Sequence, residues 1–359
     1  MGKEIVHTPK ILRTASEVEA TKAEHAPVFV NAFEAQLKEL FFIRKTEFVG
    51  TPKDEAFASN EFSDFADEKK EDFVHVYYPW NNHLVKTVDA EDYYELKTNR
   101  NQDLITAEEQ KELYGSHVAV FGLSVGSNIV TTLTQAGISK EITIADFDEL
   151  DTTNLNRILA GIHQIGLPKG VVSARRVYED NPFAEVHFFE EGVTQENIKT
   201  IAESGVKLII EEVDSLPIKI QTRLFAMEHK LPVLMVTDNG DGVVLHVERY
   251  DLGCATIFGK EPQYWIDLMQ KPAPPKEEMA KMIVDDIVGG ADQVDPRMMK
   301  SVQRVINHEL ISWPQLGSAA ILAGVVATVF TKRILLGENT IKDVRQTIFI
   351  PEDDLKTHG

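Results

Sequence analysis

The sequence predicts an α/β fold: a Rossmann-like, mostly parallel sheet with helices on both faces, an antiparallel C-terminal extension and a small N-terminal α+β unit. Three observations predict it. From residue 116 onward, short apolar runs alternate with helical segments, the first run closes in a glycine turn, and an Asn-Gly pair follows the fifth run. Strands that alternate with helices at this spacing indicate βαβ units and a parallel sheet.

Five apolar runs are the expected parallel strands. In chain order they are His117–Gly122, Glu141–Asp146, Glu185–Phe189, Lys207–Glu211 and Pro232–Thr237. Helical segments such as Ser127–Ala136 lie between them, and right-handed crossovers are expected for all of them. After Thr237, the Asn239-Gly240 pair predicts a tight turn into an antiparallel strand over Val243–Tyr250.

The two ends of the chain are less regular. In the N-terminal unit, we expect an amphipathic helix over Val28–Phe48, an exposed loop over Asp54–Asp72 and a strand over Phe73–Tyr78. Residues 260–315 are expected to form helices and loops that cap a substrate site. A helix at 316–336 and a last strand near Gln346–Ile350 complete the fold.

Composition excludes several classes of protein. The net charge of −20 argues against general nucleic-acid binding and against anionic membrane surfaces, because both require a positive footprint. The single cysteine, Cys254, rules out an internal disulfide and a Cys-rich zinc site. The uncharged stretch Leu316–Thr331 is shorter than the ~20 residues of a membrane span, so we expect a core helix. With no signal-like N-terminus, the protein is expected to be cytoplasmic.

The glycine turn after the first strand has the composition of a phosphate-binding loop. Gly122, Ser124 and Gly126 let backbone N–H groups approach phosphate oxygens at a helix N-terminus. The usual dinucleotide pattern has a glycine where Ser124 stands and one more residue before the last glycine, which weakens the assignment to NAD. From this motif alone, a βα turn that needs small residues only for packing is an equal alternative.

Two aspartates close the second strand. Asp146 and Asp148 lie about 20 residues after the glycine turn, at the edge of the sheet where a carboxylate accepts from a ribose hydroxyl. This feature suits NAD and ATP equally, and turn capping is the structural alternative.

The segment that follows carries a specific resemblance. The stretch IADFDELDTTNLNRIL…IGLPKGVVSARRVYEDNP resembles the ubiquitin-E1/ThiF/MoeB family of adenylating enzymes, over roughly residues 98 to 250. In that family an Asp-x-Asp strand end precedes Ser/Thr-Asn-Leu-x-Arg, and Gly-x-Pro-Lys then opens a helix. The resemblance implies an ATP-dependent adenylyltransferase that activates a carboxylate.

The resemblance also implies site residues. Asp146 corresponds to the ribose-binding aspartate, and Asn154, Arg157 and Lys169 correspond to polar and basic groups around the triphosphate. These types fit the chemistry, because fixed cations offset the repulsion between a carboxylate and an anionic α-phosphate.

Two further residues are implied more distantly. Asp214, after the fourth strand, corresponds to a magnesium-binding aspartate, and Mg²⁺ needs only one or two carboxylates beside phosphate oxygens. Capping of the next helix is the alternative for Asp214. Arg100 corresponds to an arginine that reaches a nucleotide phosphate, commonly from the partner subunit, and a loop salt bridge is its alternative.

The chain departs from the family at its cysteine. It lacks the zinc tetrad of many relatives, and Cys254 is the only candidate for a thioester. The nearby acids Asp251 and Glu248 disfavour a thiolate, so we expect a small buried residue. Chemistry is then expected to stop at the adenylate or to pass to a nucleophile other than cysteine.

These inferences combine into one domain plan. Residues 1–85 form an accessory unit for partner or peptide recognition, and residues 86–359 form the adenylation domain. Its parts are the nucleotide-binding core 116–250, a substrate cap 251–315, and the C-terminal helix and strand 316–359. Expected ligands are ATP, Mg²⁺ and a carboxylate from a peptide, a protein C-terminus or a small acid, but not zinc, nucleic acid or membrane. The resemblance further implies a homodimer.

Two other functions remain open at this point. An NAD(P)-dependent oxidoreductase would share the glycine turn and Asp146, but it would leave Arg157, Lys169 and Asp214 without a role. A non-catalytic E1-like partner subunit would keep the fold and the nucleotide without the reaction.

Overall fold

The computed structural model describes residues 5–272 and 274–349. The chain forms two compact units. One comprises Met1–Lys111 and Ala174–Ala184, and the other comprises Glu112–Ser173 and Glu185–Gly359, within the described ranges. The larger unit carries the glycine turn and the predicted site residues from Asp146 to Lys169 and at Asp214, whereas Arg100 belongs to the smaller unit.

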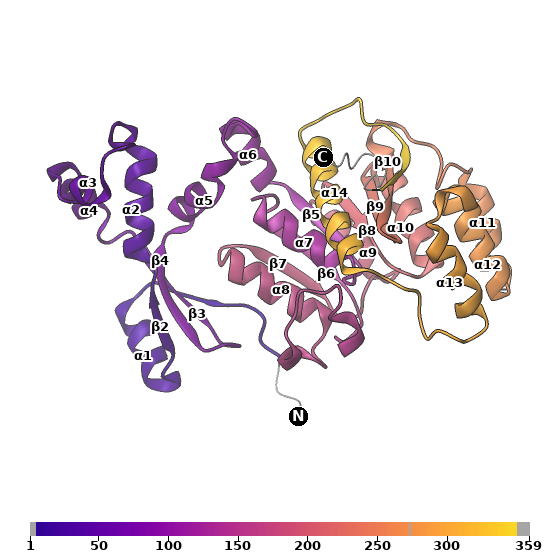
Figure 1. The fold of residues 1–359 in the computed structure, drawn as a ribbon, viewed down its shortest axis with the longest axis horizontal. Coiled ribbons are helices and arrows are strands. Elements are labelled where there is room, and N and C mark those ends of the chain that lie inside the picture. Colours follow the sequence, from indigo (N-terminus) through magenta and orange to yellow (C-terminus); the bar gives the residue numbers. More distant parts are fainter. Residues whose placement is uncertain (1–4, 273, 350–359) are drawn as a thin grey trace, which may run out of the picture. The chain divides into compact units, whose positions relative to one another are not determined.

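The larger unit is built on a seven-stranded sheet in the order β11-β10-β9-β8-β5-β6-β7 (Figure 1). Its strands are β5 (His117–Phe121), β6 (Glu141–Ala145), β7 (Glu185–Phe189), β8 (Leu208–Glu211), β9 (Pro232–Asn239), β10 (Gly242–Arg249) and β11 (Val344–Ile348). Strands β5 to β9 pair in parallel, whereas β10 is antiparallel to both β9 and β11. The strand order reverses at β5, so the carboxyl ends of β5, β6, β8 and β9 meet at one rim, the place where open α/β sheets bind ligands.

Helices connect the strands. They are α7 (Gly126–Gln135), α8 (Lys169–Asp180), α9 (Asn197–Glu203), α10 (Leu216–His229), α11 (Pro262–Met269), α12 (Lys276–Met282), α13 (Pro296–Ile306) and α14 (Gly317–Leu335). Helix α14 packs beside α7, and α9 packs beside α10. Right-handed crossovers on either side of β5 place these two pairs on opposite faces of the sheet.

The predicted fold class is confirmed. All five predicted parallel strands and the antiparallel strand after Asn239-Gly240 are present, and β5 is buried along its whole length. A strand buried on both faces is a continuous apolar run because helices cover both sides of a parallel sheet. The last strand, β11, begins at Val344, and Ile350 of the predicted strand lies outside the described residues.

The smaller unit contains a four-stranded sheet in the order β1-β3-β4-β2. Its strands are β1 (Lys10–Leu12), β2 (Val28–Asn31), β3 (Phe73–Tyr78) and β4 (His83–Val88). Its helices are α1 (Ala15–His25), α2 (Phe33–Arg44), α3 (Lys53–Phe57), α4 (Asn60–Lys69), α5 (Ala90–Thr98) and α6 (Ala107–Tyr114), the last of which extends into the larger unit. The predicted strand over Phe73–Tyr78 is confirmed.

Two predictions for this unit are wrong. Val28–Asn31 is a strand that pairs in parallel with β4, so the helix begins only at Phe33. The predicted loop Asp54–Asp72 contains α3 and α4, and the phenylalanines of α4 pack against Phe41. Local sequence patterns predicted neither the strand nor the two helices, because the strand's pairing partner and the aromatic contacts come from distant parts of the chain.

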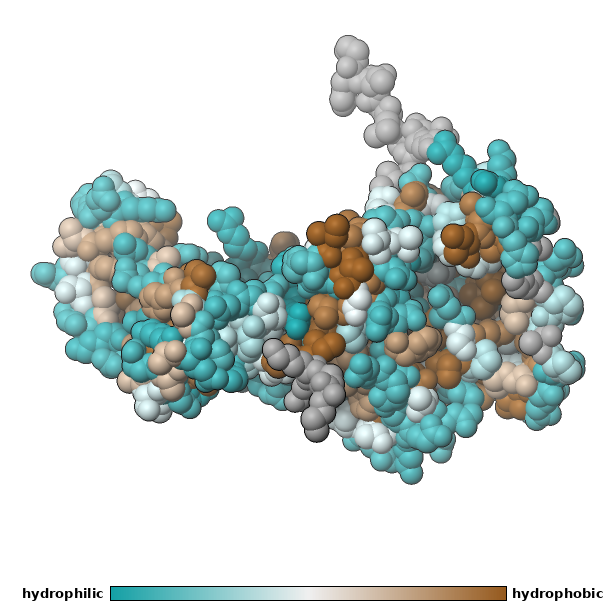
Figure 2. Space-filling view, turned by 90° about the horizontal axis from the view of Figure 1, so that it is seen from below, coloured by the Kyte–Doolittle hydropathy of each residue, from teal (hydrophilic) through white to brown (hydrophobic). Residues whose placement is uncertain are grey.

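Helix α14 alone among the described helices is long and apolar enough to cross a membrane, and 44% of that stretch is buried inside the protein. A helix in a protein core meets the same criterion, and α14 packs against α7 and β9. Ile321, Val325 and Val329 are exposed on it at four-residue spacing, which places them on one side. The face seen in Figure 2 is mostly hydrophilic, with apolar side chains gathered in separate patches.

Candidate functional site

The glycine turn between β5 and α7 forms the floor of the site. Gly122 has a positive φ of +82°, and a Cβ there would lie 2.6 Å from the carbonyl oxygen of Glu212. A side chain at this position is therefore excluded both by conformation and by space. The turn is thus packed directly against the segment that follows β8.

Asp146 ties the end of β6 to this turn. Its Oδ2 accepts from the backbone N–H of Leu123 at 2.5 Å, and its Oδ1 accepts from that of Asp148 at 2.8 Å. Burial raises the pKa of Asp146, and these two hydrogen bonds oppose the increase. Each carboxylate oxygen can accept more than one hydrogen bond, so the predicted contact with a ribose hydroxyl remains open to it.

Arg157 approaches the same turn from the loop after β6. Its Nε donates to the Ser124 hydroxyl at 2.8 Å, and its Nη1 donates to the Asn156 side chain and the Thr153 carbonyl. Nη2 has no hydrogen-bond partner among the described residues. Burial lowers the pKa of Arg157, and the charges of Asp238 and Asp214 oppose this. The structure therefore brings the predicted residues Ser124 and Arg157 into contact and leaves one nitrogen of the guanidinium for a ligand.

Lys169 and Asn154 are both engaged within the protein. Lys169 Nζ lies 2.7 Å from Asp148 Oδ2, and its backbone N–H donates to the Asp148 carbonyl. Asn154 Oδ1 accepts from the backbone N–H of Asp151, which caps the short 3-10 turn Thr152–Asn154. A phosphate would therefore compete with Asp148 for Lys169, whereas only the amide nitrogen of Asn154 remains for a ligand.

Asp214 lies on the turn between β8 and α10 and is exposed. Its charge acts on Arg157, which places the two residues at the same end of the sheet. The turn itself is held by Glu211, whose Oε1 accepts from the backbone N–H of Val213 at 2.8 Å.

Asp238, at the end of β9, was not predicted as a site residue, because turn chemistry at Asn239-Gly240 explains an aspartate equally well. It is 7% exposed, and neither carboxylate oxygen has a hydrogen-bond partner in the described part of the chain. Burial raises the pKa of Asp238 to about 6, and the charge of Arg157 opposes the increase. Its sequence signal was its place at the carboxyl end of a parallel strand.

Sequence reasoning also missed a second group of residues, which form a brace that holds the loop of Arg157 in place. Asn128 on α7 donates through Nδ2 to the backbone carbonyl of Arg157 at 2.8 Å, and Asn156 donates to the carbonyl of Gln315 at 2.8 Å. At the start of α14, a Cβ on Gly317 would lie 2.3 Å from the Asn156 carbonyl oxygen. The loop that carries Arg157 is therefore held between α7 and the segment that begins α14.

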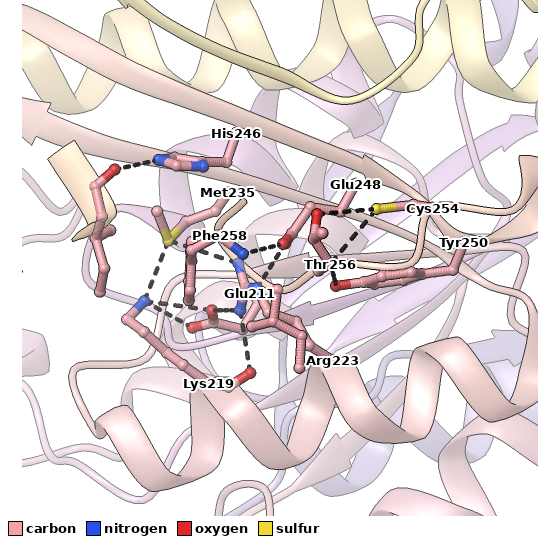
Figure 3. Close-up of polar contacts among 12 residues, drawn as sticks. Glu211, Lys219, Arg223, Met235, His246, Glu248, Tyr250, Cys254, Thr256 and Phe258 are labelled. Carbon is pink, nitrogen blue, oxygen red and sulfur yellow. Dashed lines mark hydrogen bonds and ion pairs between the residues drawn. The ribbon is translucent and has the colours of Figure 1, made fainter. Parts of the chain in front are cut away.

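Beneath the rim lies a fully paired cluster of buried charges (Figure 3). Arg223 on α10 contacts Glu211 and Glu248, each at 2.6 Å, and Lys219 contacts Glu211 at 2.9 Å. Burial alone would raise the pKa of Glu211, but the charges of Lys219 and Arg223 lower it below the usual value. The backbone N–H of Phe258 donates to the second oxygen of Glu248. This cluster joins β8, α10 and β10 to the segment that follows β10.

Cys254 lies at the edge of that cluster. Its thiol donates to the Thr256 carbonyl at 3.4 Å, and burial raises its pKa to about 11. A thiol with a raised pKa is a poor nucleophile near neutral pH. The raised pKa agrees with the expectation that Cys254 is not a nucleophile, but its side chain is half-buried and not buried as expected.

Two predicted features are not assembled by the larger unit alone. Arg100 belongs to the other compact unit, where it is exposed in the 3-10 turn Asn99–Asn101, and its role stays a prediction. Among residues 5–272 and 274–349, no group of three or more His, Cys, Asp or Glu side chains could hold a metal ion by itself.

Comparisons with known proteins agree with the resemblance seen in the sequence motifs. An uncharacterized protein of Mycobacterium tuberculosis is 39% identical over 176 residues, which cover 49% of this chain and 24% of that protein. The tRNA threonylcarbamoyladenosine dehydratase of Escherichia coli is 31% identical over 129 residues, which cover 35% of this chain and 47% of the enzyme. The chain thus spans half or less of these two curated relatives.

The fold agrees as well. The crystal structure of the E. coli tRNA N6-threonylcarbamoyladenosine dehydratase superposes with a TM-score of 0.50 and 19% identity, over 70% of this chain and 99% of that one. The sequence model of the ThiF family matches residues 96–350, which confirms the resemblance inferred from the motifs. The chain therefore belongs to the ThiF family.

Proposed function

We propose that the protein is an ATP-dependent adenylyltransferase. An oxygen of a substrate carboxylate attacks the α-phosphorus of ATP, the bond from that phosphorus to the bridging oxygen of the β-phosphate breaks, and pyrophosphate leaves with the electron pair. The product is an acyl-adenylate. The observation that carries the proposal is the contact of Arg157 with Ser124 of the glycine turn, beside the aspartate at the end of β6. Cytoplasmic ATP is the proposed source of nucleotide.

Each residue of the site has a proposed task. The turn over Gly122, Ser124 and Gly126 offers backbone N–H groups to phosphate at the start of α7. Asp146 accepts from the ribose, and the free nitrogen of Arg157 donates to a phosphate oxygen. When nucleotide binds, the ammonium group of Lys169 leaves the carboxylate of Asp148 and pairs with a phosphate oxygen. Two fixed cations near the α-phosphate lower the repulsion that the attacking carboxylate meets, and they stabilise the charge that develops on pyrophosphate.

The charges around the rim support a requirement for a divalent cation. The carboxylates there outnumber the cations: they are Asp146, Asp148, Asp214 and Asp238, against Arg157 and Lys169. ATP adds further negative charge, so a site of this composition needs additional positive charge to bind it. Asp214, exposed beside Arg157, fits the role of Mg²⁺ ligand because Mg²⁺ takes one or two carboxylates and completes its shell with phosphate oxygens and water. Bound Mg²⁺ would neutralise the β- and γ-phosphates.

The acyl substrate is proposed to be a peptide, a protein C-terminus or a small acid. The N-terminal unit (residues 1–85) would recognise it or a partner protein, and residues 251–315 would cover the activated carboxylate. The net charge of −20 disfavours tRNA as the substrate. The E. coli relative acts on tRNA by its name, so tRNA belongs in any substrate screen as the contrasting case.

ATP–pyrophosphate exchange tests the proposal. The intact chain is incubated with ATP, Mg²⁺, labelled pyrophosphate and a panel of acids, including peptides encoded near its gene, free amino acids and tRNA. We expect exchange with at least one carboxylate, loss of exchange with EDTA, and loss in Asp214→Ala. Exchange that persists in Asp214→Ala would contradict the assignment of Asp214 as the metal ligand. Bound nucleotide without exchange for any acid would identify a non-catalytic subunit instead.

A homodimer is the proposed assembly, with the exposed side of α14 as its contact. Ile321, Val325 and Val329 are 51%, 49% and 41% exposed, and a two-fold axis would bury this row against the same row of a second copy. Light scattering should give twice the chain mass for the wild type and a monomer for Val325→Glu. A wild-type monomer would contradict the assignment.

A further inference from the structure

Asp238 is an unusual residue for a structural turn. It is 7% exposed, and neither of its carboxylate oxygens has a hydrogen-bond partner among the described residues. A buried polar group without a partner costs free energy, and such a group calls for a specific explanation. The cation whose charge acts on it is Arg157, which is also the central phosphate-binding candidate.

We infer that Asp238 is a positioning residue for Arg157: it balances the guanidinium charge in the ligand-free protein, and it takes up a proton from solvent when nucleotide phosphate binds to Arg157. This inference rests on the proposed function, because it needs a phosphate at Arg157. It adds a residue and a proton to the nucleotide-binding step.

The geometry around Arg157 leads to this exchange. Nε and Nη1 are occupied by Ser124, Thr153 and Asn156, so the guanidinium is fixed and only Nη2 remains for a phosphate oxygen. Asp238 acts on Arg157 through charge without a hydrogen bond to it. A phosphate bound at Nη2 neutralises the charge of the guanidinium and brings further negative charge to the site. An ionised Asp238 then no longer has a cation to neutralise it.

The other groups near Asp238 offer no substitute for Arg157. The Gln315 side chain, from the segment before α14, is a neutral group that interacts with Asp238 and lowers its pKa, but it carries no charge to replace that of Arg157. Glu212, at the end of β8, is a second carboxyl whose pKa burial raises, and its Oε1 accepts from the Val236 N–H. Asp214 acts on Arg157 but is not among the groups that shift Asp238. Because burial already raises the pKa of Asp238 to about 6, a proton is its readiest partner once phosphate binds.

Calorimetry of MgATP binding in two buffers of different ionisation enthalpy measures the proton directly. At pH 7 and saturating Mg²⁺, we expect the wild type to take up about one proton per nucleotide bound and Asp238→Asn to take up almost none. Asp241→Asn is the matched control, because Asp241 lies on the same hairpin, carries the same charge and is exposed. It should take up as many protons as the wild type.

The pH dependence of affinity gives a second readout, which needs no variant. Above about pH 6, uptake of one proton weakens MgATP binding by up to about tenfold per pH unit in the wild type and in Asp241→Asn. Binding to Asp238→Asn should be independent of pH over the same range, which a merely structural role would not produce. Equal proton uptake in Asp238→Asn and the wild type, or pH-independent binding by the wild type, would overturn this inference and leave the proposed function intact. Failure of the wild type to bind MgATP would overturn the proposed function with it.

Discussion

Two clusters of charged side chains flank β8, and they differ in how completely they are paired. In the inner cluster, Arg223, Glu211 and Glu248 are almost completely buried, and each charge has a partner within 3 Å. In the rim cluster, within the part of the chain that the structure describes, one nitrogen of Arg157 and both carboxylate oxygens of Asp238 have no hydrogen-bond partner. A buried charge without a partner destabilises the fold, whereas a paired one can be retained in a purely structural role. The incomplete pairing at the rim therefore separates the ligand site from the structural cluster, although both contain arginines and carboxylates.

The largest expected effect comes from breaking the inner cluster. Arg223→Met leaves Glu248 buried without a cation and Glu211 with Lys219 as its remaining cation, and we expect the free energy of unfolding to fall by about 3–5 kcal/mol. Urea unfolding monitored by circular dichroism measures it. Arg333→Met is the control, because Arg333 pairs with Glu338 at the surface, where solvent screens the pair and its loss should change stability very little. Similar losses for the two variants would mean that burial does not distinguish these pairs.

In contrast to Arg223→Met, Arg157→Ala should lower activity more than it lowers stability. Removing one charge-stabilising donor costs about 10²–10³ in rate, or about 3–4 kcal/mol of transition-state stabilisation, and we expect this loss in pyrophosphate exchange. Because Arg157 is half-buried and only partly paired, unfolding should change much less than in Arg223→Met. A variant that unfolded readily but kept its exchange rate would reverse the roles assigned to the two clusters.

Asp238→Asn should change how stability depends on pH. The folded-state pKa of about 6 lies above the unfolded value of 3.8, so protonation favours the folded state. This stabilisation is complete below about pH 3.8 and is lost as pH rises through about 6, with a total of up to about 3 kcal/mol. Urea unfolding at several pH values between 4 and 7.5 should show this decline in the wild type relative to Asp238→Asn. Parallel curves would mean that Asp238 titrates normally.

The smallest effect is expected at Cys254, beside the inner cluster. Its pKa of about 11 leaves very little thiolate at neutral pH, so Cys254→Ser should leave pyrophosphate exchange unchanged. A stable thioester with a substrate acid, detected by mass spectrometry of the wild type and absent from the serine variant, would contradict this.

The sequence predicted the rim better than the inner cluster, for a physical reason. Gly122, Asp146, Arg157 and Lys169 lie in short segments whose order along the chain is itself informative. Arg223 and Glu248 come from elements that meet only in the folded sheet, so no local pattern marks them. Asp238, the rim residue that was missed, lies at the carboxyl end of a predicted strand, but turn chemistry explained it equally well. The paired helices over Asp54–Asp72 were missed similarly, because acidic surface residues mask the phenylalanines that pack inward.

The brace behind Arg157 has a practical consequence for work with fragments of this chain. The segment from Gln315 to Gly317 lies about 160 residues after Asn156, yet it receives that residue's amide and leaves no room for a Cβ beside its carbonyl. A fragment ending at residue 250 would contain every motif of the nucleotide core but would lack the support that fixes the arginine loop. Such a fragment would therefore be a poor substitute for the full chain in functional experiments, although it contains all of the sequence motifs.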